Sequence, residues 1–96
     1  MSMRSTYTTL TVRAGEIVAG EVVALGGVCF TRLAEGYPLT RHAIRQKQRF
    51  VEVSAVTVTN GWVEIKFEGG DCPANSRTMY ALFRPFELLK VQVEKQ

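Results

Sequence analysis

The 96-residue sequence lacks an apolar run that could cross a membrane. Its longest nearly uncharged stretch, residues 22–30, has nine residues, two of them glycine. A membrane-spanning helix needs about 20 apolar residues. The first residues lead into no apolar segment of the length found in secretory signals. We therefore expect no contact with membranes and a cytoplasmic location.

Cysteine and histidine are scarce. Cys29 and Cys72 lie 43 residues apart, and His42 is the single histidine. Without a Cys-x-x-Cys pair, these three soft ligands fall one short of a structural zinc site. Cys29 lies in an apolar run and is interpreted as a small core residue. A Cys72 nucleophile with His42 as its base lacks a third, orienting group. The sequence predicts no metal site and no cofactor.

Patterns typical of catalysis or nucleotide binding are also missing. The glutamates are scattered, and the glycine pairs at 26–27 and 69–70 lack the Gly-Lys-Ser/Thr continuation that holds a phosphate. The chain has no internal repeat and no linker-like stretch, and its length suits one domain. With 46% hydrophobic and 22% charged residues, its composition is that of a globular protein. We predict a single domain over residues 1–96 that is not an enzyme.

The positive charge is concentrated in one segment. Twelve basic and nine acidic residues give a formal charge of +3. Residues 32–49 contain one acidic residue, Glu35, and five cations: Arg32, Arg41, Arg45, Lys47 and Arg49. A concentrated basic segment can bind phosphates or an acidic protein surface, and that binding weakens as salt rises. The alternative interpretation is a well-solvated connecting segment.

Strand patterns cover most of the remaining chain. Residues 5–13 are rich in threonine and predict a first strand. Residues 17–30 are apolar on both faces and predict either two short strands or one strand bent by a bulge at the glycine pair 26–27. Residues 77–83 predict a further strand. Residues 89–93 alternate apolar and polar side chains, as expected for a half-buried edge strand.

The clearest local signal is Asn60-Gly61, the dipeptide favoured in a two-residue hairpin turn because both positions need a positive φ. Counting outwards places Val58 opposite Val63 and Val56 opposite Ile65, so both arms agree on one apolar face. Val51 and Val53 are out of phase with this face. One extra residue near 54–55, a β-bulge, would restore the phase and bend the strand.

Residues 40–48 allow two interpretations. Thr40 could cap a short helix, which would align Arg41, Arg45 and Arg49 along one stripe. Only Ala43 and Ile44 would hold that helix to a core. An extended loop is the alternative; it loses the alignment but keeps the local charge.

The closing part of the sequence resembles an SH3-like small β-barrel. A hairpin at 56–67, a strand at 78–83, a short turn at 84–88 and a last strand at 89–93 follow the order of that family. The resemblance implies a mainly β fold, a small barrel of five to six strands. An oligonucleotide-binding (OB-like) barrel is the alternative. Because SH3-like barrels bind nucleic acids, peptides and ribosomal partners, the resemblance alone leaves the function open.

Basic residues near aromatic rings suit single-stranded nucleic acid, which needs charge for phosphates and flat rings for bases. Tyr37 lies within the basic segment, and Trp62 lies on the predicted outer face of the hairpin. We predict a binding module that contacts DNA or RNA through residues 32–49, with Trp62 or Tyr37 stacking on a base. The alternative is a protein-interaction module, such as a small inhibitor or regulator of a nucleoprotein assembly, a structural subunit, or a homo-oligomer.

Overall fold

A computed structural model describes residues 6–32, 34, 36–68 and 78–95, with the side chains of residues 29, 42–46 and 95 outside the description. The strands are β1 (Thr6–Arg13), β2 (Val22–Thr31), β3 (Thr40–Thr59), β4 (Trp62–Glu68), β5 (Thr78–Phe83) and β6 (Leu88–Lys95). A 3₁₀ turn, η1 (Ala14–Glu16), follows β1. The predicted mainly β fold is confirmed. None of the described residues forms a helix of the length and apolarity that crossing a bilayer requires.

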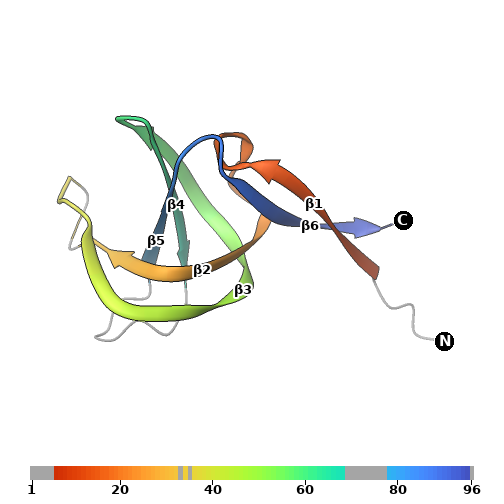
Figure 1. Cartoon of the computed structure of the whole chain (residues 1–96), viewed down its shortest axis with the longest axis horizontal. Coiled ribbons are helices and arrows are strands. Elements are labelled where there is room, and N and C mark those ends of the chain that lie inside the picture. Colours follow the sequence, from red (N-terminus) through yellow and green to blue (C-terminus); the bar gives the residue numbers. More distant parts are fainter. Residues whose placement is uncertain (1–5, 33, 35, 69–77, 96) are drawn as a thin grey trace.

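The six strands form one antiparallel sheet in the order β1-β6-β2-β3-β4-β5. Figure 1 shows β2, β3, β4 and β5 as a curved body from which β1 and β6 extend as a two-stranded ribbon. The body curls until β5 meets β2 at one residue pair, Phe30 opposite Tyr80. Over the described residues the sheet is not closed into a barrel. The number of strands matches the expectation, whereas the SH3-like or OB-like barrel type remains a prediction.

Residues 40–48 form the first half of β3, so both the predicted short helix and the predicted loop are wrong. The segment pairs with β2 from Thr31 opposite Thr40 to Leu25 opposite Arg49. A strand here gives its backbone groups partners on β2. A helix would have had only Ala43 and Ile44 to bury, and tertiary pairing outweighs helix propensity of that size.

The predicted hairpin is confirmed pair by pair. Val58 lies opposite Val63 and Val56 opposite Ile65, and the turn residues Asn60 and Gly61 have φ of 51° and 79°. The register shifts between Val53 and Ala55, as the predicted bulge requires. The bulge brings Val53 onto the core face, where it is fully enclosed.

The core lies on the concave side of the curled sheet. Its largest fully buried side chains come from four strands: Val23, Val53, Val63, Ile65 and Met79. The wall of this core includes η1, whose Ala14 is buried and donates its N–H to the Glu87 carbonyl at 2.7 Å. The buried apolar residues of these strands therefore share one interior.

The last strand is not an edge strand, contrary to the sequence expectation. β6 pairs with β1 along its whole length and also with β2, through Val22 opposite Gln92 and Val23 opposite Val91. β1 is therefore the outer strand of the sheet, and most of its side chains are exposed. The alternation of residues 89–93 reflects the half-buried ribbon, because one face of β6 packs on the core whether or not it has two neighbours.

Candidate nucleic-acid interface

Four of the five cations of the basic segment, all but Arg32, lie on the bent first half of β3. Arg41, Lys47 and Arg49 are exposed, and within the described part of the chain none of the three has an ion pair. The backbone of Arg45 lies on the same strand, opposite Val28, while its side chain lies outside the description. The excess positive charge therefore lies mostly on a strand of the sheet and not on a connecting loop.

Extra residues on β3 produce this bend. From Leu25 to Thr31 β2 advances six residues, whereas the facing stretch from Thr40 to Arg49 advances nine. β3 therefore carries three more residues than its partner, in two places where the register shifts. Bulged strands curve and twist more strongly than regular ones. The curvature spreads the exposed cations along an arc.

Gly26 allows the two strands to approach at the first of these shifts. A Cβ on Gly26 would lie 2.8 Å from the Gln48 Cα and 3.0 Å from its backbone nitrogen. No side chain fits at such distances. The glycine pair of the sequence therefore supports a single bent β2, one of the two predicted alternatives, and its neighbour Gly27 has a φ of +101°.

Arg32 differs from the other cations because its charge is satisfied within the chain. Its Nη2 donates to Glu64 Oε1 at 2.9 Å, and its guanidinium lies 4.8 Å from the centroid of the Tyr80 ring. Only 17% of the Arg32 side chain and 15% of the Glu64 side chain are exposed. Partial burial lowers the pKa of Arg32, but the hydrogen bond to Glu64 and its negative charge outweigh this and raise the pKa overall.

This contact fastens the end of β2 to the convex face of β4 and β5. Tyr80 is directly opposite Lys66 on β4 and opposite Phe30 on β2. The ring of Tyr80 is buried although it lies on the convex face, since Arg32 lies over it. Arg32 therefore holds the curled sheet together at the place where β5 meets β2.

Trp62 is partly covered by another arginine. The Arg84 guanidinium carbon lies 3.7 Å from the centroid of the Trp62 ring, and Arg84 Nη1 donates to the Gly61 carbonyl at 3.3 Å. Trp62 is 38% exposed, so part of its side chain remains accessible. The arrangement is a cation–π contact between the β3–β4 turn and the turn before β6.

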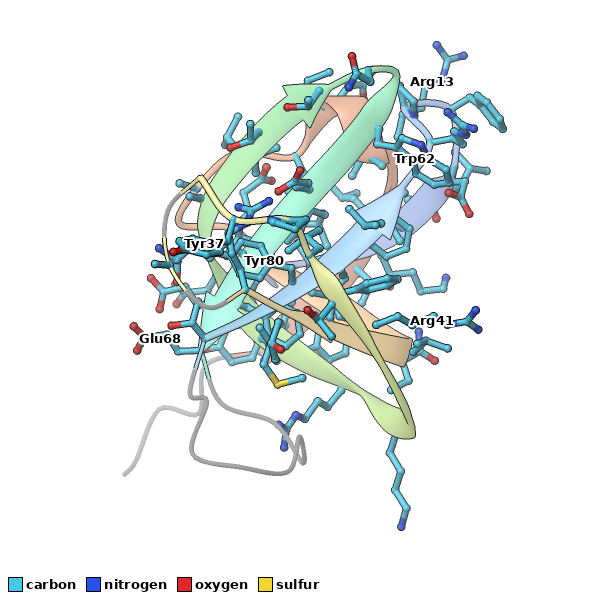
Figure 2. All side chains as sticks on the ribbon, turned by 90° about the vertical axis from the view of Figure 1, so that its left-hand side faces the viewer. Arg13, Tyr37, Arg41, Trp62, Glu68 and Tyr80 are labelled. Atoms are coloured by element: carbon cyan, nitrogen blue, oxygen red, sulfur yellow. The ribbon has the colours of Figure 1, made fainter. Side chains whose placement is uncertain are left out.

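The residues predicted to act together lie in separate places. Figure 2 shows Trp62, Tyr37 and Arg41 in three different regions of the molecule. Trp62 is opposite Thr59 at the tip of the hairpin, ten residues along β3 from Arg49. Tyr37 is exposed in a turn in which its N–H donates to the Ala34 carbonyl at 3.1 Å. The structure does not bring these aromatic residues onto the basic strand.

The exposed ring that does belong to the basic strand is Phe50, which follows Arg49 directly and lies opposite Ala24. The sequence placed Phe50 at the border of the basic segment without selecting it. Neither Tyr80 under Arg32 nor Arg84 over Trp62 could be recognised from the sequence, because each contact joins segments more than twenty residues apart. A contact between an arginine and an aromatic ring at such a separation leaves no periodic pattern in the sequence.

A shallow hollow next to the β3 bulge has the opposite charge. It is lined by Glu52, Val53, Ser54 and Glu68. Two carboxylates at its rim repel phosphate, so the bulged stretch of β3 at residues 52–54 is unsuited to nucleic acid. Among the described residues, no three His, Cys, Asp or Glu side chains gather as a metal ion would require. Cys72 and the side chains of Cys29 and His42 lie outside the description.

Comparison with known proteins adds no relative. No family model, no curated protein and no solved structure matches this chain.

Proposed function

We propose that the chain is a small, non-enzymatic binding module whose basic segment, residues 32–49, contacts the phosphates of DNA or RNA. The observation that carries the proposal is a set of exposed cations on the arc of β3 that have no ion pair with any described residue: Arg41, Lys47 and Arg49. β3 is paired with β2 on both sides of its two register shifts, so these cations stay on one arc and can contact several phosphates of the same strand. Arg45 belongs to the same stretch by sequence.

The expected binding is mainly electrostatic and independent of base sequence. Phosphate contacts position a protein without reading bases. Of the two aromatic residues predicted to stack, Trp62 is partly covered by Arg84 and Tyr37 lies apart from Arg41. Among the described side chains of β3, Phe50 is the exposed aromatic ring, and it is the candidate for stacking on an unpaired base, on the face of the strand opposite to that of Arg49. Arg32 is proposed to act within the fold, since Glu64 already balances its charge.

The test is fluorescence anisotropy with labelled single-stranded DNA, duplex DNA and single-stranded RNA over a salt series. Each phosphate contact contributes about 0.9 to the slope of log K against log salt on duplex DNA. Replacing Arg41, Lys47 and Arg49 by alanine should therefore flatten that slope by about two to three. Lys90→Ala, which removes an exposed cation from β6, is the matched control and should leave the slope unchanged.

A second variant distinguishes the contribution of base stacking from that of phosphate contacts. Phe50→Ala should weaken binding to single strands by about 1–3 kcal/mol and leave the salt slope intact, because a ring carries no charge. If the unmodified protein binds none of the three probes at about 50 mM salt, where phosphate contacts are strong, the proposal is wrong.

The second candidate function is a protein-interaction module, including a small inhibitor or regulator of a nucleoprotein assembly. A specific feature favours it: the turn between β5 and β6 presents two large apolar side chains, Phe86 at 71% and Leu88 at 66% exposure. This turn is well fixed, because the Arg84 N–H donates to Glu87 Oε2 at 2.6 Å. Exposed apolar residues on a rigid support are typical of protein contacts. Capture of a protein partner that survives nuclease treatment and is lost in Phe86→Ser would favour this function.

A further inference from the structure

β1 is an open strand edge without the features that normally protect one. Within the described residues no strand pairs with its outer side, and its eight residues, TYTTLTVR, are mostly β-branched or aromatic. Its only charged residue is Arg13 at the end, and it has no proline, lysine or glycine. Natural edge strands usually carry such residues or a bulge to prevent pairing with other chains. β1 pairs regularly with β6 over its full length, without a bulge.

The ribbon that β1 forms with β6 also has little support of its own. It extends away from the curled body, with the C-terminus at its far end (Figure 1). A two-stranded ribbon in water is only marginally stable, and additional strands stabilise it. Leu10 lies opposite the buried Val91 yet is itself 54% exposed. The apolar face of the ribbon is therefore half covered, and its uncovered half lies at the open edge.

We propose that the occupant of this edge is a second copy of the chain, whose β1 pairs antiparallel with β1 around Leu10. This two-fold arrangement places Leu10 opposite the second copy's Leu10. It joins Val91, Leu10 and their two symmetry mates into one continuous apolar row across four strands. Thr8 then lies opposite the second copy's Val12, which continues the same face. Isologous pairing of this kind closes on itself and stops at the dimer.

The other face of the strand supports the same register through charge. In that register Tyr7 lies opposite the second copy's Arg13, and Tyr7 is already opposite Glu94 within its own chain. Glu94, Tyr7 and the second copy's Arg13 therefore lie side by side across three strands. The guanidinium of Arg13, the one charged group on β1, lies next to the Tyr7 ring and near the Glu94 carboxylate. Because the two-fold axis repeats the arrangement, both arginines are matched. Thr9 opposite the second copy's Thr11 places two small polar side chains between these rows.

The dimer is expected to be weak. The seven paired residues, 7–13, span about 23 Å, and one strand pair of this length buries less than the roughly 1,200 Å² of a standard stable interface. A dissociation constant of about 1–100 μM is the expected range. Sedimentation velocity over a concentration series should then show a mass that rises from 10.7 kDa towards twice that value. A constant mass of one chain up to about 1 mM, or growth beyond two chains, would overturn the proposal.

Leu10→Lys tests the assignment to β1, because it places two like charges opposite each other at the centre of the pairing. It should raise the dissociation constant at least tenfold, while Val18→Lys should leave it unchanged. Val18 is the matched control, being an aliphatic residue outside β1 that is 59% exposed. Equal dimerisation of Leu10→Lys and the unmodified chain would contradict the assignment. Far-UV circular dichroism shows whether each variant folds.

The register is tested by crosslinking. Directly opposite residues of an antiparallel pair have Cα atoms about 4.5–5.5 Å apart, within the range that a disulfide needs. With Cys29 and Cys72 replaced by alanine, Leu10→Cys should form a covalent dimer under mild oxidation. Val18→Cys should not. Equal crosslinking at both positions would indicate random collision and refute the register.

Discussion

Arg32 on the chain just after β2 and Glu64 on β4 form an ion pair with an Nη2–Oε1 distance of 2.9 Å, and both side chains are largely buried. Arg32 also lies over Tyr80 of β5. One side chain therefore connects three strands at the place where the curled sheet comes nearest to closing. Arg32 was predicted to bind phosphate with the other cations of the basic segment. Its surroundings instead favour a role in stability.

Arg32→Met should lower the free energy of unfolding and leave nucleic-acid affinity and its salt slope unchanged. Methionine keeps the apolar stem but leaves the Glu64 carboxylate partly buried without its partner, which costs about 1–3 kcal/mol. Urea unfolding followed by circular dichroism measures this cost. Arg41→Ala is the matched comparison, because Arg41 is exposed and unpaired among the described residues. It should change stability by less than about 0.5 kcal/mol.

A double-mutant cycle then isolates the pair. Arg32→Met with Glu64→Gln should destabilise by less than the sum of the two single changes, with a coupling of about 1 kcal/mol. Strictly additive effects would show that the two side chains do not depend on each other. If the slope of log K against log salt falls by about one in Arg32→Met, Arg32 contacts a phosphate after all.

The hairpin could be predicted from the sequence because its determinants are local. Asn60 and Gly61 fix the turn, and the phase of the valines on either side fixes the register. The same phase argument located the bulge near residue 54, since Val53 could reach the core only if one residue was left out of the pairing. One expected core residue, Val58, is exposed instead, because β2 ends its pairing with β3 at Glu52 and leaves the hairpin tip uncovered.

The curl of the sheet and the placement of the cations could not be predicted in this way. Both depend on the three extra residues of β3 relative to β2, which become visible only once the two strands are aligned. Residues 40–48 contain good helix formers but little apolar content, so local patterns could not decide their structure. The partners of Arg32 and Trp62 come from distant segments and have no signature in the sequence. The sequence therefore predicted which residues carry the charge of the candidate site, but it predicted neither the strand that holds them nor their geometry.

Arg84→Ala should expose the ring of Trp62. Trp62 is the single tryptophan, so fluorescence reports on it alone. Loss of the guanidinium over the ring should shift its emission to longer wavelength and increase quenching by iodide. The cost in stability should be about 0.5–1 kcal/mol, as for a cation–π contact near the surface. The hydrogen bond from the Arg84 backbone to Glu87 survives the change, so the turn should persist.

Lys90→Ala is the control for Arg84→Ala, because it removes an exposed cation that has no described contact with Trp62. Its emission spectrum should match that of the unmodified chain. Identical spectra for Arg84→Ala and the unmodified chain would mean that the guanidinium does not cover the ring in solution. The Arg84 guanidinium would then be free for a partner.

Gly26→Ala should destabilise the bend on which the basic strand depends. The added Cβ would lie 2.8 Å from the Gln48 Cα, so β2 and β3 must move apart locally. Overpacking of this kind typically costs about 1–3 kcal/mol. Because the close atoms belong to the backbone, shortening the side chain with Gln48→Ala should not restore stability in the double variant. Rescue by Gln48→Ala would show that the side chain, and not the strand backbone, sets the spacing.

The same variant links the bend to binding. If the arc of β3 sets the spacing of Arg41, Lys47 and Arg49, then Gly26→Ala should weaken nucleic-acid binding under conditions in which the protein remains folded. The salt slope should fall together with affinity, because fewer cations would reach phosphates at once. Ala24→Gly is the comparison on the same strand: it opposes Phe50 without a backbone clash and should affect stability while leaving the slope intact. An unchanged slope in folded Gly26→Ala would show that the cations act independently of the curvature, as they would on any flexible basic segment.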